Sequence, residues 1–258
     1  MKKYLKEENL DVLAQTYEDL EDDSHVLHLW EPFDVNIDEN YKFVEDGFLF
    51  SFLSHLIYVI GFPILFIIQK LFFGFKIYGI NNLKSTYKIG KVTVSNHIHF
   101  IDCTMIAMTN ILDKTYFTSL ESNFKIPIVR KLIKLLHAIP IPKDIRYKKR
   151  FMKNIDFLLN NGKGVHFYPE GSLWPYYQKL RKFKNGAFSF AVRNNVPVIP
   201  YVFKFEKVTG IRKYIKKKPF IRLYILEPEF PNTNLNYKEA VNELKNRVHS
   251  KMEEAINK

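Results

Sequence analysis

The sequence predicts an α/β fold, with a largely parallel sheet flanked by helices. From residue 75 onward, short runs rich in β-branched and aromatic residues alternate with longer amphipathic stretches of helical period. Such alternation is typical of proteins in which helices cover both faces of a parallel sheet. The 258 residues are 47% hydrophobic, so the chain has the length and the composition to form a core of this kind.

The elements follow one another in regular order through this region. The predicted strands cover residues 75–79, 90–95, 114–118, 138–142, 164–168, 197–203 and 219–226. The predicted helices cover residues 101–111, 126–136, 145–161, 184–194 and 237–257. Parallel strands end at the same edge of a sheet, and α/β proteins place their ligand sites at that carboxyl edge. Polar residues that directly follow a predicted strand are therefore the candidates for function.

Two segments precede the α/β domain, which we expect to span residues 75–258. Residues 1–46 contain fourteen acids and four lysines, and we interpret them as an acidic arm. Residues 47–74 form a hydrophobic helical segment, within which 47–68 lack any charged residue. Pro63 should kink this helix. A single kinked span and two short helices in one leaflet are the membrane interpretations, and a buried core helix is the alternative.

Charge is distributed unevenly along the chain. The whole sequence carries +12, the arm carries −10, and the rest therefore carries +22. A body this basic seeks anionic partners, among them lipid headgroups, phosphate esters, acidic carrier proteins and nucleic acid. The single cysteine, Cys103, excludes an internal disulfide and a thiolate metal cluster, and it fits a reducing compartment. The lysines expected to face an anionic membrane are Lys70, Lys76, Lys213, Lys216, Lys217 and Lys218.

The first candidate site follows the apolar strand at 92–94 and reads Ser-Asn-His-Ile-His-Phe-Ile-Asp. Histidine is the side chain that ordinarily titrates near neutrality, so an imidazole at position 97 can take a proton from a hydroxyl and later release it. Asp102, five residues on, can bond the other ring nitrogen and stabilise the imidazolium. Two alternatives remain open from these residues alone: capping of the next helix, or a metal site that also uses His99.

Three further polar segments follow predicted strands or open predicted helices. The run at 165–172 ends in Pro-Glu-Gly, where Gly171 permits a tight turn and Glu170 can accept bonds from hydroxyls. Lys143 follows the strand at 138–142. The basic run at 179–184 precedes a helix, and its cations can hold a phosphate. An ordinary turn and a solvated charged face are the alternative interpretations.

The order of these segments resembles the glycerolipid acyltransferase family, best known for the 1-acyl-sn-glycerol-3-phosphate (lysophosphatidate) acyltransferases. The resemblance covers about residues 75–205. It rests on Asn-His-x4-Asp, a strand ending in a basic residue, Phe-x-Pro-Glu-Gly, and Val-Pro-Val-Ile-Pro, in that order. Two departures concern the acceptor's phosphate: Lys143 replaces an arginine, and Leu173 stands where the third block also has arginine. Lys179, Arg181 or Lys182 is expected to compensate.

The resemblance implies acyl transfer from acyl-CoA or acyl-carrier protein to a lysophosphatidate-like hydroxyl in phospholipid biosynthesis, with no metal or other cofactor. It implies His97 as the base and Asp102 as its orienting partner. The residues expected to bind substrate are Asn96, Lys143, Glu170, Gly171, Ser172, Lys179 and Arg181. Membrane lipids and the thioester donor are the expected partners, nucleic acid is not, and the expected location is the cytoplasmic side of a membrane. Another lipid acceptor, a His/Asp metallohydrolase and a non-catalytic binder of anionic membranes are the rival hypotheses.

Overall fold

The computed structural model describes residues 37–38, 41–45, 47–111, 113–125, 127–210, 214 and 219–258. Most of the predicted acidic arm therefore lies outside the described residues. So do Lys213, Lys216, Lys217 and Lys218, which were expected to face a membrane.

Within the described residues, seven strands form one sheet in the order β1-β7-β6-β2-β5-β3-β4. The strands are β1 (Lys76–Tyr78), β2 (Lys91–Ser95), β3 (Thr115–Leu120), β4 (Ala138–Ile141), β5 (Gly164–Phe167), β6 (Val198–Glu206) and β7 (Phe220–Ile225). The five strands from β6 to β4 run parallel, while β7 is antiparallel to β6 and carries β1 beside it. The predicted class is confirmed, and each predicted strand is present within three residues at either end.

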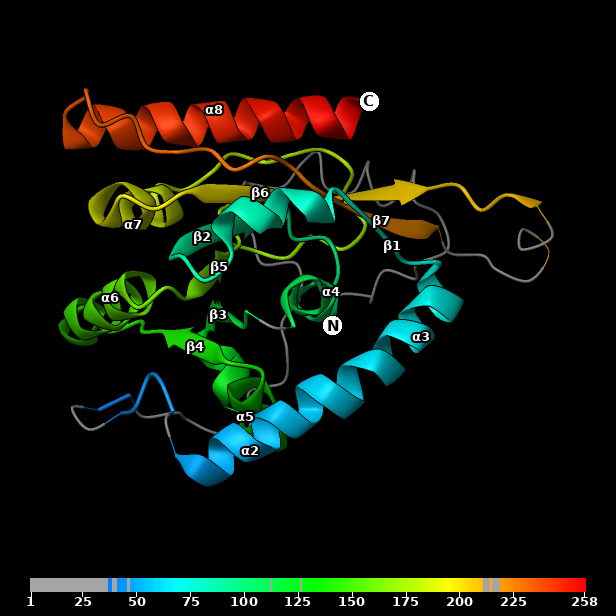
Figure 1. The fold of residues 1–258 in the computed structure, drawn as a ribbon, viewed down its shortest axis with the longest axis horizontal. Helices are drawn as coiled ribbons and strands as arrows, with labels where there is room; N and C mark the ends of the chain where they lie inside the picture. The colour runs from blue at the N-terminus through cyan, green and yellow to red at the C-terminus, as the bar shows by residue number, and fades with distance from the viewer. Residues whose placement is uncertain are drawn as a thin grey trace, which may run out of the picture.

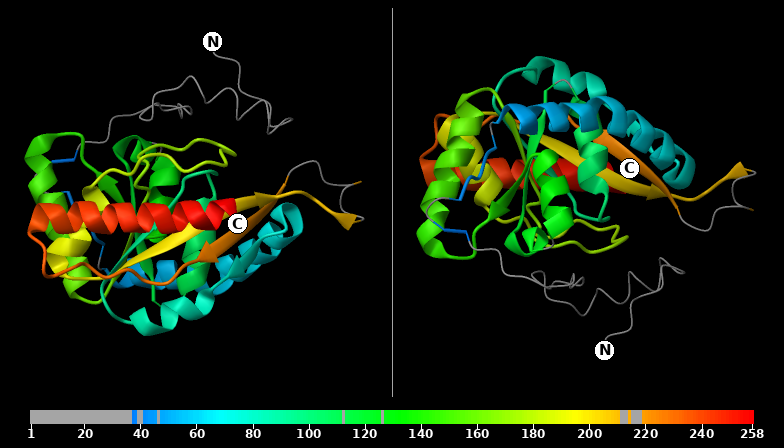
Figure 2. Two further views of the ribbon diagram at one scale, coloured as in Figure 1. Left: turned by 90° about the horizontal axis from the view of Figure 1, so that it is seen from above. Right: turned by 90° about the horizontal axis from the view of Figure 1, so that it is seen from below.

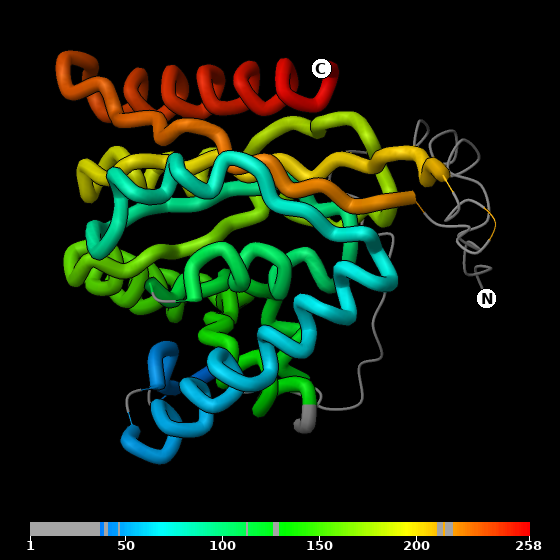
Figure 3. Tube along the Cα trace, turned by 45° about the vertical axis from the view of Figure 1, so that its right-hand side comes forward, coloured from blue at the N-terminus to red at the C-terminus, as the bar shows by residue number. Residues whose placement is uncertain are grey.

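Helices cover both faces of this sheet (Figures 1 and 2). One face carries α6 (Ile145–Asn160), α7 (Gly186–Asn194) and α8 (Tyr237–Asn257), which contact β5, β2 and β6 respectively. The other face carries α4 (Asp102–Ala107) and the long N-terminal helix. The short helix α5 (Pro127–Leu135) lies between β4 and that N-terminal helix. Figure 3 shows α8 and the N-terminal helix on opposite sides of the sheet.

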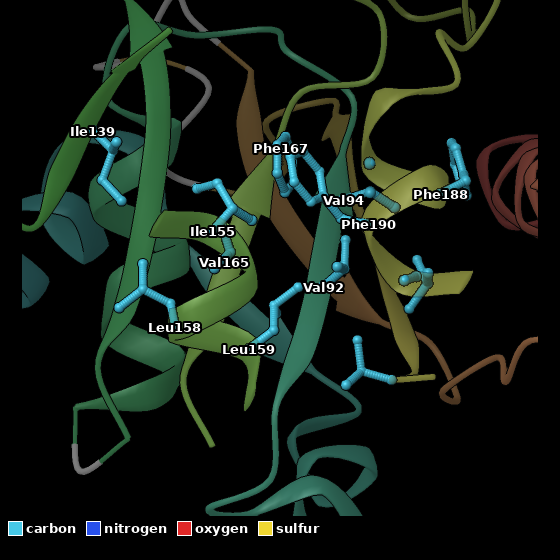
Figure 4. Packing of buried hydrophobic residues seen from close by; sticks show 14 of the residues in the cluster. Val92, Val94, Ile139, Ile155, Leu158, Leu159, Val165, Phe167, Phe188 and Phe190 are labelled. Carbon is cyan, nitrogen blue, oxygen red and sulfur yellow. The ribbon is translucent and has the colours of Figure 1, made fainter. Parts of the chain in front are cut away.

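The central strands β2 and β5 carry the core (Figure 4). Val92 and Val94 of β2 and Val165 of β5 are fully buried, and Phe167 stacks on Phe190 of α7 at 5.4 Å between ring centroids. Burial of each such side chain contributes about 1.5–3 kcal/mol. A parallel sheet covered by helices on both faces buries its central strands completely, so the polar residues within these two runs, Thr93 and His166, are fully buried and hydrogen-bonded to each other.

The hydrophobic segment forms one continuous helix made of α2 (Phe48–Leu56), a π-helical turn η1 (Ile57–Gly61) and α3 (Phe62–Phe73). The expected break into two helices is therefore wrong, while the kink expected at Pro63 stays a prediction. The amide of Phe62 donates to the carbonyl of Ile57, five residues back, so the wider turn precedes the proline, whose ring would otherwise clash with a carbonyl. The helix thereby continues through Pro63 without a break.

Only one face of this helix is buried. Ser54, Tyr58, Phe62 and Gln69 face the domain, while 17% of the most apolar window is buried. By length and composition the helix Phe48–Phe73 is a candidate membrane span. Both of its ends contact the α/β domain, because Ser54 bonds the ring of His137 and Gln69 donates to Thr104. A buried core helix is excluded by the exposure of the outer face.

Candidate active site

The loops that follow β2 and β5 meet at the carboxyl edge of the sheet. The strands pair in parallel, with Val94 opposite Phe167, so residues 96–101 and 168–171 leave neighbouring strands side by side. Backbone bonds then join the two loops further along: Trp174 donates to the carbonyl of His97 at 3.1 Å, and Tyr176 donates to that of Ile98 at 2.9 Å. These two hydrogen bonds fix the position of the loop that carries His97.

His97 and Asp102 form a hydrogen-bonded pair, here called the dyad. The ring Nδ1 of His97 lies 2.7 Å from Oδ2 of Asp102, which opens helix α4. The backbone amides of Ile98 and His99 donate to the same oxygen at 3.3 and 3.4 Å. The side chain of Asp102 is 1% exposed and that of His97 is 21% exposed. The carboxylate is thus held inside the protein, while part of the imidazole side chain remains exposed.

Tyr168, which the sequence analysis did not select, completes the surroundings of the dyad. Its hydroxyl donates to Oδ1 of Asp102 at 2.6 Å, and its ring stacks on that of His97 with 3.7 Å between centroids. Burial by itself would raise the pKa of Asp102. The charge of His97 and the hydrogen bonds from His97, Tyr168 and the backbone of His99 outweigh burial and hold that pKa below its usual value.

A second histidine lies directly behind Tyr168. His166 is fully buried, with its two ring nitrogens 2.9 Å from Oγ1 of Thr93 and 3.3 Å from Oγ of Ser95. Burial lowers its pKa to about 3, so it stays neutral at physiological pH. Its ring meets that of Tyr168 edge to face at 4.6 Å. His166 and Tyr168 both stand shortly before the Pro-Glu-Gly turn in the sequence. Polar residues at the end of a strand that leads into such a turn are the signal that could have identified both.

Glu170 and Arg181 form a buried ion pair that braces the His97 loop. Oε2 of Glu170 accepts from the backbone amide of His97 at 3.1 Å and from the guanidinium of Arg181 at 3.0 Å. Oε1 accepts from the backbone amide of Arg181 at 3.1 Å. Burial raises the pKa of Glu170, with Arg181 opposing that effect. Arg181 also donates to Oγ of Ser172 at 2.7 Å and lies over the ring of Trp174 at 4.3 Å.

This arrangement corrects several expected substrate contacts. Glu170, Ser172 and Arg181 are each about 3% exposed and bond one another, so Arg181 does not offer its guanidinium to a phosphate. Both side-chain amide atoms of Asn96 bond the backbone of Phe203 at 3.0 and 2.8 Å. That side chain joins the loop to β6 and is turned away from a substrate.

Gly171 has a structural role that the sequence correctly suggested. Its φ of +85° is a conformation that favours glycine, and its amide donates to the carbonyl of Tyr168 at 3.0 Å. A Cβ at this position would lie 2.9 Å from the side chain of Lys184. The turn therefore holds Glu170 under the dyad. Because the Gly171 amide is already bonded within the turn, it is not available to donate to a substrate oxygen.

The two expected lysines lie at the rim of this edge. Lys143 is exposed and follows β4, three strands from β2 in the sheet order, which corresponds to roughly 14 Å at the usual strand spacing. Its backbone amide donates to Glu121 at 2.9 Å. Lys179 is exposed in the loop between β5 and α7. Contact of either lysine with an acceptor phosphate stays a prediction.

The geometry of His99 argues against a metal site built on the His-x-His spacing. Its Nδ1 accepts from the backbone amide of Ile101 at 3.3 Å, and its ring packs against Phe73, Phe100 and Tyr176. Burial lowers its pKa to about 4, against the opposing effect of Asp102. In the part of the chain that the structure describes, no three His, Cys, Asp or Glu side chains are placed to hold a metal ion.

Comparison with known proteins agrees with this geometry. Over 130 and 131 residues, the chain is 31% and 33% identical to chloroplastic 1-acyl-sn-glycerol-3-phosphate acyltransferases of Brassica napus and Arabidopsis thaliana. Each alignment covers 50% of this chain, and the chain spans 37% and 35% of the length of these relatives.

The fold is that of a solved bacterial enzyme. The crystal structure of the 1-acyl-sn-glycerophosphate acyltransferase PlsC from Thermotoga maritima superimposes with a TM-score of 0.51. The match covers 80% of this chain and 93% of the other at 19% identity. The model of the acyltransferase family matches residues 74–204, which include His97, Asp102, Glu170 and Arg181. Since this match takes in half of the sequence and the whole dyad, the chain belongs to the acyltransferase family.

Proposed function

We propose that the protein transfers an acyl group from a thioester donor to the free hydroxyl of a lysophosphatidate-like lipid. The observation that carries the proposal is the dyad: a buried carboxylate orients an accessible imidazole at the carboxyl edge of a sheet that has the family's fold. The names of the relatives from Brassica napus and Arabidopsis thaliana supply the class of acceptor.

In this mechanism, Nδ1 of His97 is engaged by Asp102, so Nε2 receives the proton of the acceptor hydroxyl. The alkoxide oxygen forms a bond to the thioester carbonyl carbon, and collapse of the tetrahedral intermediate breaks the carbon–sulfur bond. His97 then returns the proton to the thiolate. Asp102 stabilises the imidazolium that exists between these two transfers. The enzyme forms no covalent intermediate with the acyl group.

The donor and the acceptor both carry phosphate, and the basic body of the chain suits both. Acyl-CoA and acyl-carrier protein remain the two donors in this proposal. Lys143 and Lys179, exposed at the rim of the dyad's edge, are the proposed contacts for the acceptor's phosphate. Arg181 is not among them, since it pairs with Glu170.

The test uses full-length protein, one acyl-CoA, and a panel of lysophospholipids and other hydroxyl acceptors. Release of free thiol that depends on the acceptor, together with the new ester seen by lipid mass spectrometry, is the expected result. His97→Ala should abolish release while the protein remains folded. His99→Asn, which can still accept from the amide of Ile101, is the matched control and should retain activity. Equal turnover by wild type and a folded His97→Ala variant would refute the mechanism.

We also propose that the protein lies on the surface of a membrane, on the cytoplasmic side. The outer face of α2 and α3 exposes apolar side chains over its whole length, from Phe48 at 88% to Phe72 at 67%. Both ends of this helix pack on the α/β domain, so an upright span would carry the domain into the bilayer. A helix lying in the plane of one leaflet satisfies both observations. The basic body and the free thiol of Cys103 support the cytoplasmic side.

Flotation of the full-length protein with vesicles tests this location. Apolar insertion is not screened by salt, so the protein should float with neutral vesicles and remain bound in high salt. Glutamate at the exposed positions Phe52 and Ile64 should abolish flotation, whereas glutamine at the exposed Lys238 of α8 should not. Wild-type protein that stays soluble without detergent and ignores vesicles would refute membrane association while leaving the chemistry of the dyad untouched.

A further inference from the structure

A polar cavity lies at the amino edge of the sheet, opposite the edge that holds the dyad. It has a volume of about 540 Å³. Three of its lining residues stand directly before or close before strands: Lys88 precedes β2, Lys114 precedes β3, and Lys163 precedes β5. Because these strands are parallel, their starts meet at one edge, and three cations from distant parts of the sequence gather around one cavity.

The positive charge of this cavity is not neutralised by its own acids. Asp113 is buried and forms an ion pair with the buried Lys91, whose Nζ also donates to the carbonyl of Thr86 at 2.7 Å. Glu45, which also lines the cavity, pairs with Lys134 at 2.8 Å. Among the described residues, none of the three cavity lysines has an ion-pair partner. The cavity therefore presents an unbalanced positive potential.

The walls of the cavity are fixed by packing. Gly162, with φ of +72°, turns the chain from α6 into β5, and a Cβ there would lie 2.6 Å from the carbonyl of Lys88. This close approach holds Lys88 beside Lys163. Lys114 lies over the ring of Tyr58 at 5.0 Å. The buried ring of His137 bonds Ser54 at 3.1 Å, and burial with the charges of Lys114 and Lys163 lowers its pKa to about 4, so it adds no charge of its own.

One side of the cavity is formed by α2, part of the helix that we place in the membrane. Phe50 and Ser51 of α2 line the cavity, and their neighbours Phe48, Leu49 and Phe52 are 88%, 66% and 55% exposed. A ligand that enters the cavity with an anionic group thus has apolar side chains directly beside it. A phosphate with attached acyl chains satisfies both features at once, because lysines hold the phosphate and the exposed face of α2 contacts the chains.

We propose that this cavity binds the phosphate headgroup of an anionic membrane lipid, and that it does so independently of the substrate site. It rests on the membrane association proposed above but not on acyl transfer. The site would anchor the amino edge of the sheet at the bilayer, while α3 reaches the dyad's edge through the contact between Phe73 and His99. One helix then holds both edges at the same membrane.

The experiment compares flotation of the full-length protein on two kinds of vesicle: phosphatidylcholine alone, and phosphatidylcholine mixed with phosphatidylglycerol. The readout is the partition coefficient for the mixed vesicles divided by the partition coefficient for phosphatidylcholine alone. Lys114→Gln combined with Lys163→Gln should lower this ratio about 25-fold, since each cation near an anionic leaflet strengthens binding about fivefold. Lys238→Gln combined with Lys258→Gln removes the same charge from α8, on the other side of the sheet, and should leave the ratio unchanged.

A third variant separates a defined cavity from diffuse charge. Ser51→Phe fills the cavity but keeps all three lysines, and Ser51 is exposed, so the change is compatible with folding. It should lower the ratio as well, and a wild-type ratio would overturn the proposal of a cavity. An equally large fall of this ratio in the Lys238/Lys258 control would also overturn the proposal. Displacement from mixed vesicles by inorganic phosphate, relative to chloride at equal ionic strength, would assign the cavity to a free anion instead.

The same measurements distinguish this proposal from acyl transfer. Binding to neutral vesicles reports membrane association, and the ratio reports the cavity. His97→Ala should keep the wild-type ratio, and the Lys114/Lys163 variant should keep wild-type turnover on a detergent-solubilised acceptor. Loss of turnover without any change in the ratio would overturn the assignment of the cavity to lipid binding.

Discussion

Replacement of Tyr168 by phenylalanine removes one hydroxyl from the site and little else. The ring that stacks on His97 at 3.7 Å remains, as does the edge contact with His166. What disappears is the 2.6 Å hydrogen bond to Oδ1 of Asp102. The other oxygen keeps its bond to His97. In the proposed mechanism, Tyr168 thus acts through Asp102 and is a positioning residue.

The magnitude follows from the kind of bond that is lost. A hydrogen bond to a charged group is worth about 1.5–3 kcal/mol, and Asp102 is too deeply buried for water to replace the donor freely. If that stabilisation supports the imidazolium in the transition state, kcat should fall about 10- to 100-fold. The KM of the acceptor should hardly change, because Tyr168 is buried and acts only through the dyad.

The pH profile gives a second readout that a merely structural role would not change. The folded protein holds the pKa of Asp102 below its usual value, and Tyr168 is one of the groups that lower it. The ionised form, and the stability that depends on it, is present at neutral pH and is lost as the pH falls. Without the hydroxyl the pKa of Asp102 rises, so the acidic limb of the dyad's rate profile should move to higher pH.

The assay is acceptor-dependent thiol release across a pH series, with thermal unfolding of each variant as a check of folding. Tyr224→Phe is the matched control, because Tyr224 also bonds a carboxylate, that of Glu206 at 3.4 Å, at the far side of the sheet. It should leave kcat and the pH profile unchanged. A folded Tyr168→Phe variant with wild-type kcat and an unmoved acidic limb would refute this reasoning.

Other variants test the remaining parts of the site. Asp102→Asn should lower kcat by about 10³–10⁴ in the thiol-release assay, since an amide cannot balance the imidazolium, and near-normal turnover would contradict that role. Arg181→Met should lower the free energy of unfolding by about 3–5 kcal/mol in denaturant titrations because it leaves Glu170 buried without its partner, whereas Lys238→Met should not; normal stability would mean that the ion pair does not brace the loop. Lys143→Ala should raise the KM for lysophosphatidate more than it lowers kcat, and should not affect a phosphate-free acceptor; an unchanged KM would remove Lys143 from the phosphate site.

The sheet and its helices were predictable because their signals are local. Strand runs such as 164–168 and the amphipathic stretch at 145–161 encode their own period, and the structure places β5 and α6 within a residue of them. The sequence left open whether the N-terminal helix is continuous, because Pro63 by itself signals an interruption. The π-helical turn that absorbs the proline depends on how the backbone packs over several residues, which the sequence pattern does not reveal.

In the candidate site, too, contacts between residues close in the sequence were predictable and contacts between distant residues were not. His97 and Asp102 were predicted to pair because they lie five residues apart in one loop, and the structure places them at 2.7 Å. Tyr168 reaches Asp102 across 66 positions, and Arg181 reaches Glu170 across eleven in an irregular loop. Neither separation corresponds to a regular period, so only the tertiary structure reveals these partners.

The buried ion pair of Glu170 and Arg181 bears on the departure at Leu173, where the family pattern has an arginine. The sequence pattern suggested that a nearby cation replaces that arginine at the acceptor's phosphate. In the structure, the guanidinium of Arg181 pairs with the glutamate of the third block and bonds Ser172. Arg181 therefore supports the His97 loop from beneath, and we propose that exposed lysines at the rim contact the phosphate instead. A point charge on a flexible stem binds phosphate with less geometric demand than a bidentate guanidinium, so this protein should discriminate less sharply between phosphate-bearing acceptors than one that uses arginine there.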